Sequence, residues 1–173
     1  GQETYGEDPV LTSQIGTAFA KGIQGDHPRY LKAVATPKHY AVHSGPEPDR
    51  HHFNAITDMR DLWDTYLPAY EATITEGKAF SIMGAYNRYL GQACCAHDLL
   101  LGDILRDQWG FKGYVVSDCG AIRDIYASHK LVDSQEEAAA LAVKKGCDMS
   151  CEGFYNLLDR AVGQGLITEE EID

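Results

Sequence analysis

The feature that most constrains the fold is a repeated alternation of helix-like and strand-like segments along the 173 residues. Apolar positions at helical spacing predict helices at 8–24, 58–75, 97–110, 134–146 and 154–165, with shorter ones ending at Ile125 and beginning at Thr168. Short apolar runs predict strands at 30–40, 79–87, 113–118 and 147–151. Because strands that alternate with helices pair in parallel, the sequence predicts an α/β fold with helices covering the sheet.

Local signals mark several helix ends. Asp8 followed by Pro9 has the form of an N-cap and first helical residue. Ser134 and Glu137 have the spacing of a capping box, and His97 or Asp98 is expected to cap the helix that follows. No glycine-rich phosphate-binding motif follows any of the predicted strands, so the common nucleotide-binding form of the fold has no support.

Polar or reactive residues stand at the ends of the predicted strands. They are Lys38 with His39, Tyr86 with Asn87, Asp118, and the segment 150–152. Asp118 alone is equally well explained as an N-cap of the next helix. A cap does not explain the polar pairs at the other strand ends. Since parallel strands bring their carboxyl ends to one edge, we expect these side chains to meet in a single pocket.

The charge of the chain argues against several kinds of partner. Its net charge is −11 and its pI is about 5.0, so neither a nucleic-acid backbone nor an anionic membrane surface is an expected partner. No apolar run approaches the ~20 residues of a membrane span. The chain begins "GQETYGEDP", without an initiator Met or a signal pattern, and we expect it to be an internal piece of a longer protein.

The cysteines and histidines raise the question of disulfides and metals. Five cysteines form no paired framework, and we expect all of them to be buried free thiols: Cys94, Cys95, Cys119, Cys147 and Cys151. His39 and His43 are four residues apart, but the zinc-protease pattern requires Glu after the first His and a regular helix. Tyr40 follows His39 instead, so the sequence predicts no metal site.

Five blocks in order resemble glycoside hydrolase family 3, the β-glucosidase and β-xylosidase family. The blocks are "GQETYGEDPVLT", "ATPKHYAVHSGPEPDRHHFNA", "YLPAYEATI", "SIMGAYNRYLGQAC" and "LLLGDILRDQWGFKGYVVSDCGA". The resemblance implies a (β/α)8 TIM-type barrel with parallel strands. It implies that residues 1–173 are a partial catalytic barrel domain, about the C-terminal half, with the rest of the enzyme absent.

The resemblance also implies roles for particular residues. Asp118 matches the family's nucleophile, while Lys38, His39, Met83 and Tyr86 match residues that bind the sugar. The implied reaction is hydrolysis of terminal β-linked glucose or xylose with retention of configuration, through a covalent glycosyl-enzyme on Asp118 and without a cofactor. The substrate is then a small carbohydrate, and the residues do not separate glucose from xylose.

The chain departs from the family pattern in ways that leave alternatives open. The family's acid/base carboxyl lies outside this stretch, and no motif marks Glu47, Asp49 or Glu152 as a substitute. Cys119 stands where many members carry Trp. The chain by itself is therefore expected to be inactive, or to be a non-catalytic carbohydrate-binding half-barrel. Its unpaired sheet edges predict a homo-oligomer. A Schiff-base lyase using Lys38 is a further alternative, without any phosphate-binding signal to support it.

Overall fold

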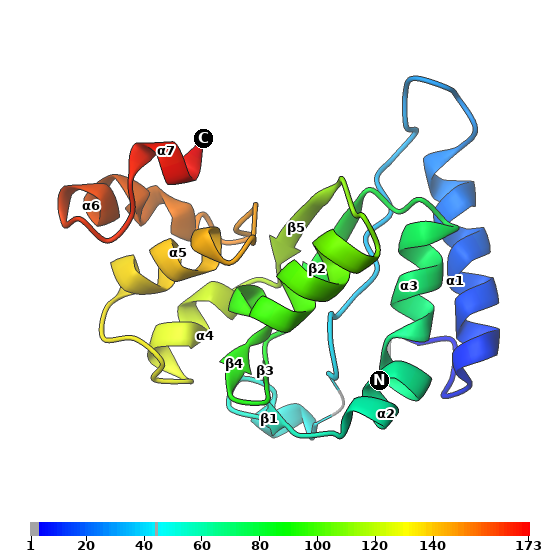
Figure 1. Ribbon diagram of the computed structural model, residues 1–173, viewed down its shortest axis with the longest axis horizontal. Helices are drawn as coiled ribbons and strands as arrows, with labels where there is room; N and C mark the ends of the chain where they lie inside the picture. Colours follow the sequence, from blue (N-terminus) through cyan, green and yellow to red (C-terminus); the bar gives the residue numbers. More distant parts are fainter. Residues whose placement is uncertain (1–3, 44) are drawn as a thin grey trace.

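A computed structural model of the chain describes residues 4–43 and 45–173. Residues 1–3 of the first family block and residue 44 of the polar loop lie outside the described residues. At the centre, strands β2 (Ser81–Gly84) and β5 (Tyr114–Ser117) pair in parallel, with Ile82 opposite Val115 (Figure 1). Both of these facing residues are fully buried, which places the core around this pair of strands.

Two further segments extend the sheet on either side. Tyr40 forms a parallel bridge with Gly84, and Met149 forms one with Val116. The spatial order therefore follows the sequence: the segment ending at Tyr40, then β2, then β5, then the segment at Met149. Consecutive parallel strands lying side by side are the arrangement of a barrel wall. This confirms the prediction of an α/β fold with a parallel sheet.

The strands expected at 30–40 and 147–151 are less regular than predicted. Along the first, the carbonyls of Ala35 and Pro37 accept hydrogen bonds from the amides of Ser81 and Met83. Pro37 has no N–H of its own, so the ladder to β2 is interrupted there. The peptide bonds Lys38–His39 and Tyr40–Ala41 are cis. These segments lie where the sequence places them, but they do not form continuous strands.

The helices cover the sheet and gather in two groups (Figure 1). On one side, α1 (Pro9–Gln24) lies along α3 (Pro68–Thr75). At the opposite end are α4 (Ala121–Ala127), α5 (Gln135–Lys144), η5 (Phe154–Leu157), α6 (Leu158–Gly163) and α7 (Glu169–Ile172). No helix in the described part of the chain is long and apolar enough to cross a membrane.

The predicted helix ends are largely confirmed. The Asp8 side chain accepts hydrogen bonds from the amides of Val10 and Leu11, and Pro9 is the first helical residue. Ser134 and Glu137 form the expected capping box, and His97 caps η4 (Asp98–Gln108) through its ring.

The helix expected over 58–75 is divided into three parts. They are α2 (Met59–Asp61), the π-helix η2 (Leu62–Tyr66) and α3. Pro68 begins the last part because it has no N–H to bond the preceding turn.

The loop before β2 and the connection between β2 and β5 together form a small projection, and the π-helix η4 follows it in the sequence. Short strands β1 (Asn54–Ala55), β3 (Arg88–Tyr89) and β4 (Gln92–Ala93) form the projection, with β1 parallel to β3 and β3 antiparallel to β4. The turns η1 (Glu47–Asp49) and η3 (Cys94–Ala96) complete it. β1 and η1 both belong to the long polar loop of the sequence, so the projection brings that loop beside the end of β2.

The cysteine prediction is wrong for one pair. Cys119 and Cys151 form a disulfide with Cα atoms 4.8 Å apart, whereas Cys94, Cys95 and Cys147 are free and buried as predicted. The two bonded residues follow neighbouring parallel segments, β5 and the one containing Met149. Adjacent parallel strands bring their carboxyl ends together, although 32 residues separate the two cysteines in the sequence.

Candidate active site

Asp118 lies directly after β5, at the carboxyl end of the sheet. Its amide donates to the carbonyl of Gly84, which holds it against β2, and its Oδ1 accepts from the amide of Cys119 at 2.7 Å. The N-cap of α4 is Gly120, which has a positive φ of 92° and forms no side-chain cap. The Asp118 side chain therefore does not cap α4, and its other oxygen, Oδ2, faces His39.

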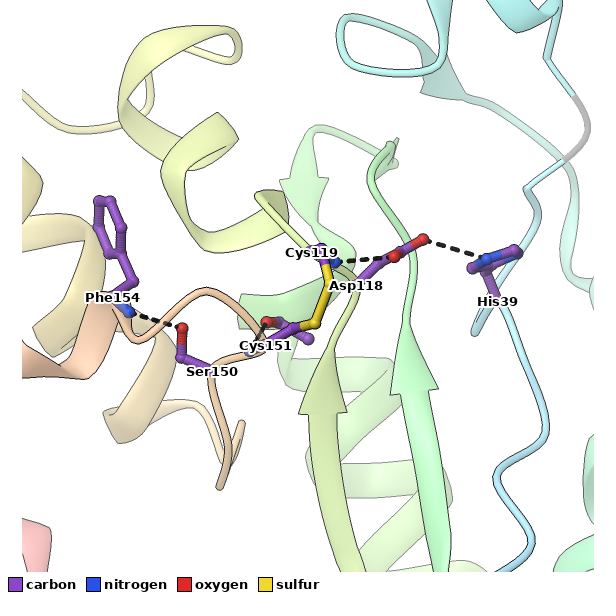
Figure 2. The surroundings of a disulfide bond; sticks show 7 residues. His39, Asp118, Cys119, Ser150, Cys151 and Phe154 are labelled. Carbon is purple, nitrogen blue, oxygen red and sulfur yellow. Dashed lines mark hydrogen bonds and ion pairs between the residues drawn. A yellow bond between two sulfur atoms is a disulfide. The ribbon is translucent and has the colours of Figure 1, made fainter.

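His39 occupies the matching position on the segment that pairs with the opposite edge of β2. Its Nε2 lies 3.1 Å from Oδ2 of Asp118, and the two side chains are only 17% and 13% exposed. Because a carboxylate can only accept, His39 donates this hydrogen bond. The Tyr70 hydroxyl donates a hydrogen bond to the His39 carbonyl at 2.6 Å, and this bond holds the backbone of His39 in place. Figure 2 shows the two side chains pointing toward each other across the end of β2.

The protonation of Asp118 follows from these contacts. Partial burial raises the pKa of Asp118, but the hydrogen bonds from His39 and from the Cys119 amide, with a smaller one from Tyr86, outweigh burial and lower the pKa below its usual value. Asp118 is consequently a carboxylate at neutral pH. An ionised, partly desolvated carboxylate at the base of a pocket is the state in which such a group acts as a nucleophile.

Tyr86 lies beside this carboxylate and is held by two neighbours. The His51 ring centroid is 4.5 Å from that of Tyr86, and the Arg50 guanidinium carbon lies 4.9 Å from the Tyr86 ring centroid. Burial, followed by the charge of Asp118, raises the pKa of Tyr86 to about 12. Tyr86 is therefore neutral at physiological pH, with a hydroxyl hydrogen to donate.

A buried carboxylate fixes His51 and the loop that carries it. His51 Nδ1 lies 2.6 Å from Oδ2 of Asp124, whose side chain is 3% exposed. Arg50 Nε donates to His51 Nε2 at 3.3 Å, and Arg50 also pairs with Glu47 at 2.7 Å. This chain of contacts joins the polar loop to α4, the helix that follows Asp118. No local residue pattern predicts the contact between His51 and Asp124, because the two residues are 73 positions apart.

One cavity of about 950 Å³ is lined by four of the predicted polar side chains, whereas Asn87 and the segment 150–152 are not among its described lining residues. Lys38, His39, Tyr86 and Asp118 all line it, as the strand-end argument predicts. The cavity also extends along α1 and α3. Met83 is half-buried on β2, and it is not among the described residues that line the cavity.

His43 also lines this cavity, and sequence reasoning considered it only as a metal ligand. Its ring centroid lies 4.8 Å from that of His39, and its Nδ1 is 3.1 Å from Oδ1 of Asn87. Glu47 and Arg50 are further lining residues that the strand-end argument did not select. These residues come from the loop after the first predicted strand, where residue patterns give no position in space. Within residues 4–43 and 45–173, no group of three or more His, Cys, Asp or Glu residues is arranged to hold a metal.

The disulfide lies next to Asp118 (Figure 2). Cys119 directly follows the carboxylate in the sequence, and Cys151 is bonded to it from the neighbouring segment. The amide of Cys151 donates to Ser117 Oγ at 3.1 Å, which adds a second link between the two strand ends. The exposed disulfide thus forms part of the rim beside Asp118.

Parallel segments in sequence order, with a carboxylate and its partners at their carboxyl ends, define a piece of a barrel-type α/β catalytic domain. The Glycosyl hydrolase family 3 N terminal domain matches the chain over residues 1–173. The chain belongs to glycosyl hydrolase family 3, as the sequence blocks predict.

Relatives and solved structures agree with this family. The chain is 48% identical over 179 residues to a xylan 1,4-beta-xylosidase of Xylanibacter ruminicola, covering 100% of this chain and 21% of the relative. A GH3 exo-beta-xylosidase in complex with a xylobiose aziridine activity-based probe superposes with a TM-score of 0.95 at 31% identity, over 99% of this chain and 23% of the other. A β-glucosidase involved in saponin metabolism from intestinal bacteria gives a TM-score of 0.90 at 31% identity, over 99% and 23% of the two chains. The chain thus spans less than a quarter of the length of these proteins.

Proposed function

We propose that this chain is the part of a retaining β-glycosidase that carries the nucleophile, Asp118. The observation that carries the proposal is the pair formed by Asp118 and His39, which lie 3.1 Å apart at the ends of the two segments that flank β2 and which both line the cavity. The proposed substrates are oligosaccharides or glycosides with a terminal β-linked xylose or glucose. The similarity to xylosidases and to a β-glucosidase supports both sugars.

In the proposed reaction, Asp118 attacks the anomeric carbon while the glycosidic C–O bond breaks. The leaving oxygen takes a proton from a second carboxyl, and a covalent glycosyl ester forms on Asp118. Water then attacks the same carbon, gives its proton back to the second carboxyl, and releases Asp118 as a carboxylate. The lowered pKa of Asp118 supports this role, because the attacking group must be ionised.

The neighbouring residues would bind the sugar and orient the nucleophile. His39 holds one oxygen of Asp118 and leaves the carboxylate group aligned with the cavity. The Tyr86 hydroxyl, neutral because its pKa is about 12, donates toward the same carboxylate. Lys38 lines the cavity and would donate to sugar hydroxyls, and Met83 would contribute an apolar contact from β2.

The second carboxyl is proposed to lie in the remainder of the enzyme. We assign residues 1–173 to about the C-terminal half of the catalytic barrel. Glu47 is occupied by Arg50 at 2.7 Å, and Glu152 is exposed beside Gly120. Both side chains are exposed, whereas a catalytic acid lies in buried surroundings. The isolated chain is therefore proposed to lack turnover.

Covalent labelling of the complete enzyme tests the proposal. Dinitrophenyl glycosides of 2-deoxy-2-fluoroxylose and 2-deoxy-2-fluoroglucose form esters that hydrolyse slowly, so the labelled peptide can be identified by mass spectrometry. We expect one fluoroglycosyl group per chain, attached to Asp118. Asp118→Asn should not be labelled, whereas the matched control Glu152→Gln should be labelled as the wild type is. A label on another carboxylate, or no label on a folded and substrate-binding enzyme, would contradict the assignment.

A further inference from the structure

The inference begins with a buried amide, Asn87, whose orientation is fixed by its surroundings. Asn87 has no exposed surface, and its Nδ2 lies 3.0 Å from the carbonyl oxygen of Arg88 and 3.4 Å from those of Ala41 and Val42. Carbonyl oxygens only accept hydrogen bonds, so the NH₂ group of Asn87 must face them. The Oδ1 atom therefore faces His43, at 3.1 Å from Nδ1.

This orientation determines which ring nitrogen of His43 carries hydrogen. Because Oδ1 of Asn87 only accepts, Nδ1 of His43 is the protonated nitrogen. Burial lowers the pKa of His43, although the bond to Asn87 acts in the opposite direction. The ring is consequently neutral at pH 7, and Nε2 has an unshared electron pair. In the described part of the chain, no hydrogen bond to Nε2 of His43 is formed.

His43 lies close to the residues that contact Asp118. His43 lines the same cavity as His39 and Tyr86, with ring centroids 4.8 Å and 6.4 Å from theirs. Of the other polar side chains that line the cavity, Lys38 and Arg50 can only donate, and His39 and the Tyr86 hydroxyl donate to Asp118. Each sugar hydroxyl has a hydrogen of its own to donate, and a site made only of donors would leave these hydrogens without partners. Glu47 is already paired with Arg50.

We propose that Nε2 of His43 accepts a hydrogen bond from one hydroxyl of the pyranose bound beside Asp118. His43 is thereby a further substrate-binding residue that selects for the presence and orientation of that hydroxyl. Asn87 acts through His43 as a positioning residue, because it sets which ring nitrogen is the acceptor. This inference rests on the proposed glycosidase function and names one of its substrate contacts.

Deoxygenated substrates distinguish this contact from a structural role. The complete enzyme and its His43→Phe variant, which keeps a ring without an acceptor, are assayed with nitrophenyl β-xyloside and with its 2-deoxy, 3-deoxy and 4-deoxy analogues. We expect kcat/KM of His43→Phe to fall about 10-fold on the parent xyloside, the usual effect of removing one neutral hydrogen bond. On the one analogue that lacks the partner hydroxyl, the variant and the wild type should have equal kcat/KM.

Two further variants complete the experiment. His43→Gln offers a carbonyl oxygen as acceptor and should recover part of the lost kcat/KM. The matched control His52→Phe, at an exposed histidine of the same loop, should leave kcat/KM unchanged on every substrate. Thermal melting of each variant shows that the enzyme is folded.

Two outcomes would overturn the assignment. One is an equal loss for His43→Phe on the xyloside and on all three analogues, which would show a purely structural effect. The other is an unchanged kcat/KM of His43→Phe on the parent xyloside, which would show that His43 makes no contact with the sugar. Failure of fluoroglycoside labelling at Asp118 is a separate result. It would overturn the proposed nucleophile, but it would not change how kcat/KM of the wild type and of His43→Phe compare on the deoxy analogues.

Discussion

Two amphipathic helices of this molecule, η4 and α1, differ in how far their apolar residues are buried. In η4, four apolar residues are almost completely buried, with exposed fractions of 0–1%: Leu100, Leu101, Ile104 and Leu105. In α1, four apolar residues are 38–66% exposed: Val10, Leu11, Ile15 and Phe19. The sequences of both helices predict one buried face. Within residues 4–43 and 45–173, the apolar face of η4 is fully covered and that of α1 is not.

The difference follows from the position of each helix relative to the sheet. η4 connects β2 to β5, and each of these strands has a neighbour on both sides. α1 packs mainly against α3, beside the segment that pairs with β2 along one edge (Figure 1). The proposed active site uses both regions of the molecule. Asp118 follows the enclosed strand β5, whereas His39 lies on the edge segment. Chemistry and packing can therefore be tested separately on the two sides.

The largest expected effect is on the enclosed side, at Asp118. In the complete enzyme, Asp118→Asn should lower kcat on the order of 10⁴-fold, because the amide cannot form the glycosyl ester. Since Asp118 contributes little to the apolar core, the melting temperature should change only slightly. Hydrolysis of nitrophenyl β-xyloside and circular dichroism measure the two quantities. Near-normal turnover, or unfolding, would favour a structural role for Asp118.

Paired alanine substitutions compare the two helices directly. Ile104→Ala in η4 should reduce the free energy of unfolding by about 3 kcal/mol, because it leaves a cavity in a closed core. Ile15→Ala in α1 should reduce it by less than about 0.5 kcal/mol in the isolated chain, as for a surface position.

The same pair of variants in the complete enzyme sharpens the comparison. If the remainder of the enzyme covers α1, the cost of Ile15→Ala should rise to about 2 kcal/mol there. Urea unfolding of both forms provides the measurement. Equal costs for Ile15→Ala in the isolated chain and in the complete enzyme would show that the exposed face of α1 has no partner.

The exposed side also predicts self-association of the isolated chain. An edge segment and the apolar face of α1 are both uncovered, and we expect copies of the chain to associate through them. Ile15→Glu with Phe19→Glu should shift the mass measured by light scattering toward that of a single chain. The matched control Arg60→Glu changes an exposed residue of α2 and should leave the mass unchanged. A wild-type chain that remains a monomer at high concentration would refute this prediction.

The smallest expected effect is a pH dependence of the unfolding free energy, which arises from the contact between His39 on the edge segment and Asp118 after β5. The pKa of Asp118 is lowered in the folded state, so its contribution to stability is present above its unfolded pKa of about 3.9. This contribution is lost as the pH falls through the lower, folded value. The difference in unfolding free energy between wild type and Asp118→Asn should therefore be larger at pH 7 than at pH 2. A difference independent of pH would show that the bond between His39 and Asp118 does not stabilise the ionised carboxylate.

Much of the fold and the central part of the site could be predicted from sequence. Periodicity and caps gave the helices, including Asp8 before α1 and the box of Ser134 and Glu137, since these signals act within a few residues. The rule that parallel strands end at one edge correctly brought Lys38, His39, Tyr86 and Asp118 to one cavity. The proposed roles of these residues came from the family resemblance.

Other features were decided only by the tertiary structure. The bond between Cys119 and Cys151, the pair of His51 and Asp124, and the contact of Asn87 with His43 join residues 32 to 73 positions apart. Such pairs depend on which strands are neighbours and on how a loop folds back, and neither is encoded in a local pattern. The sequence alone determined the order of the elements and the chemistry at the strand ends. Packing in three dimensions decided which face of each helix is covered and which distant side chains touch, because burial and contact depend on all neighbours at once.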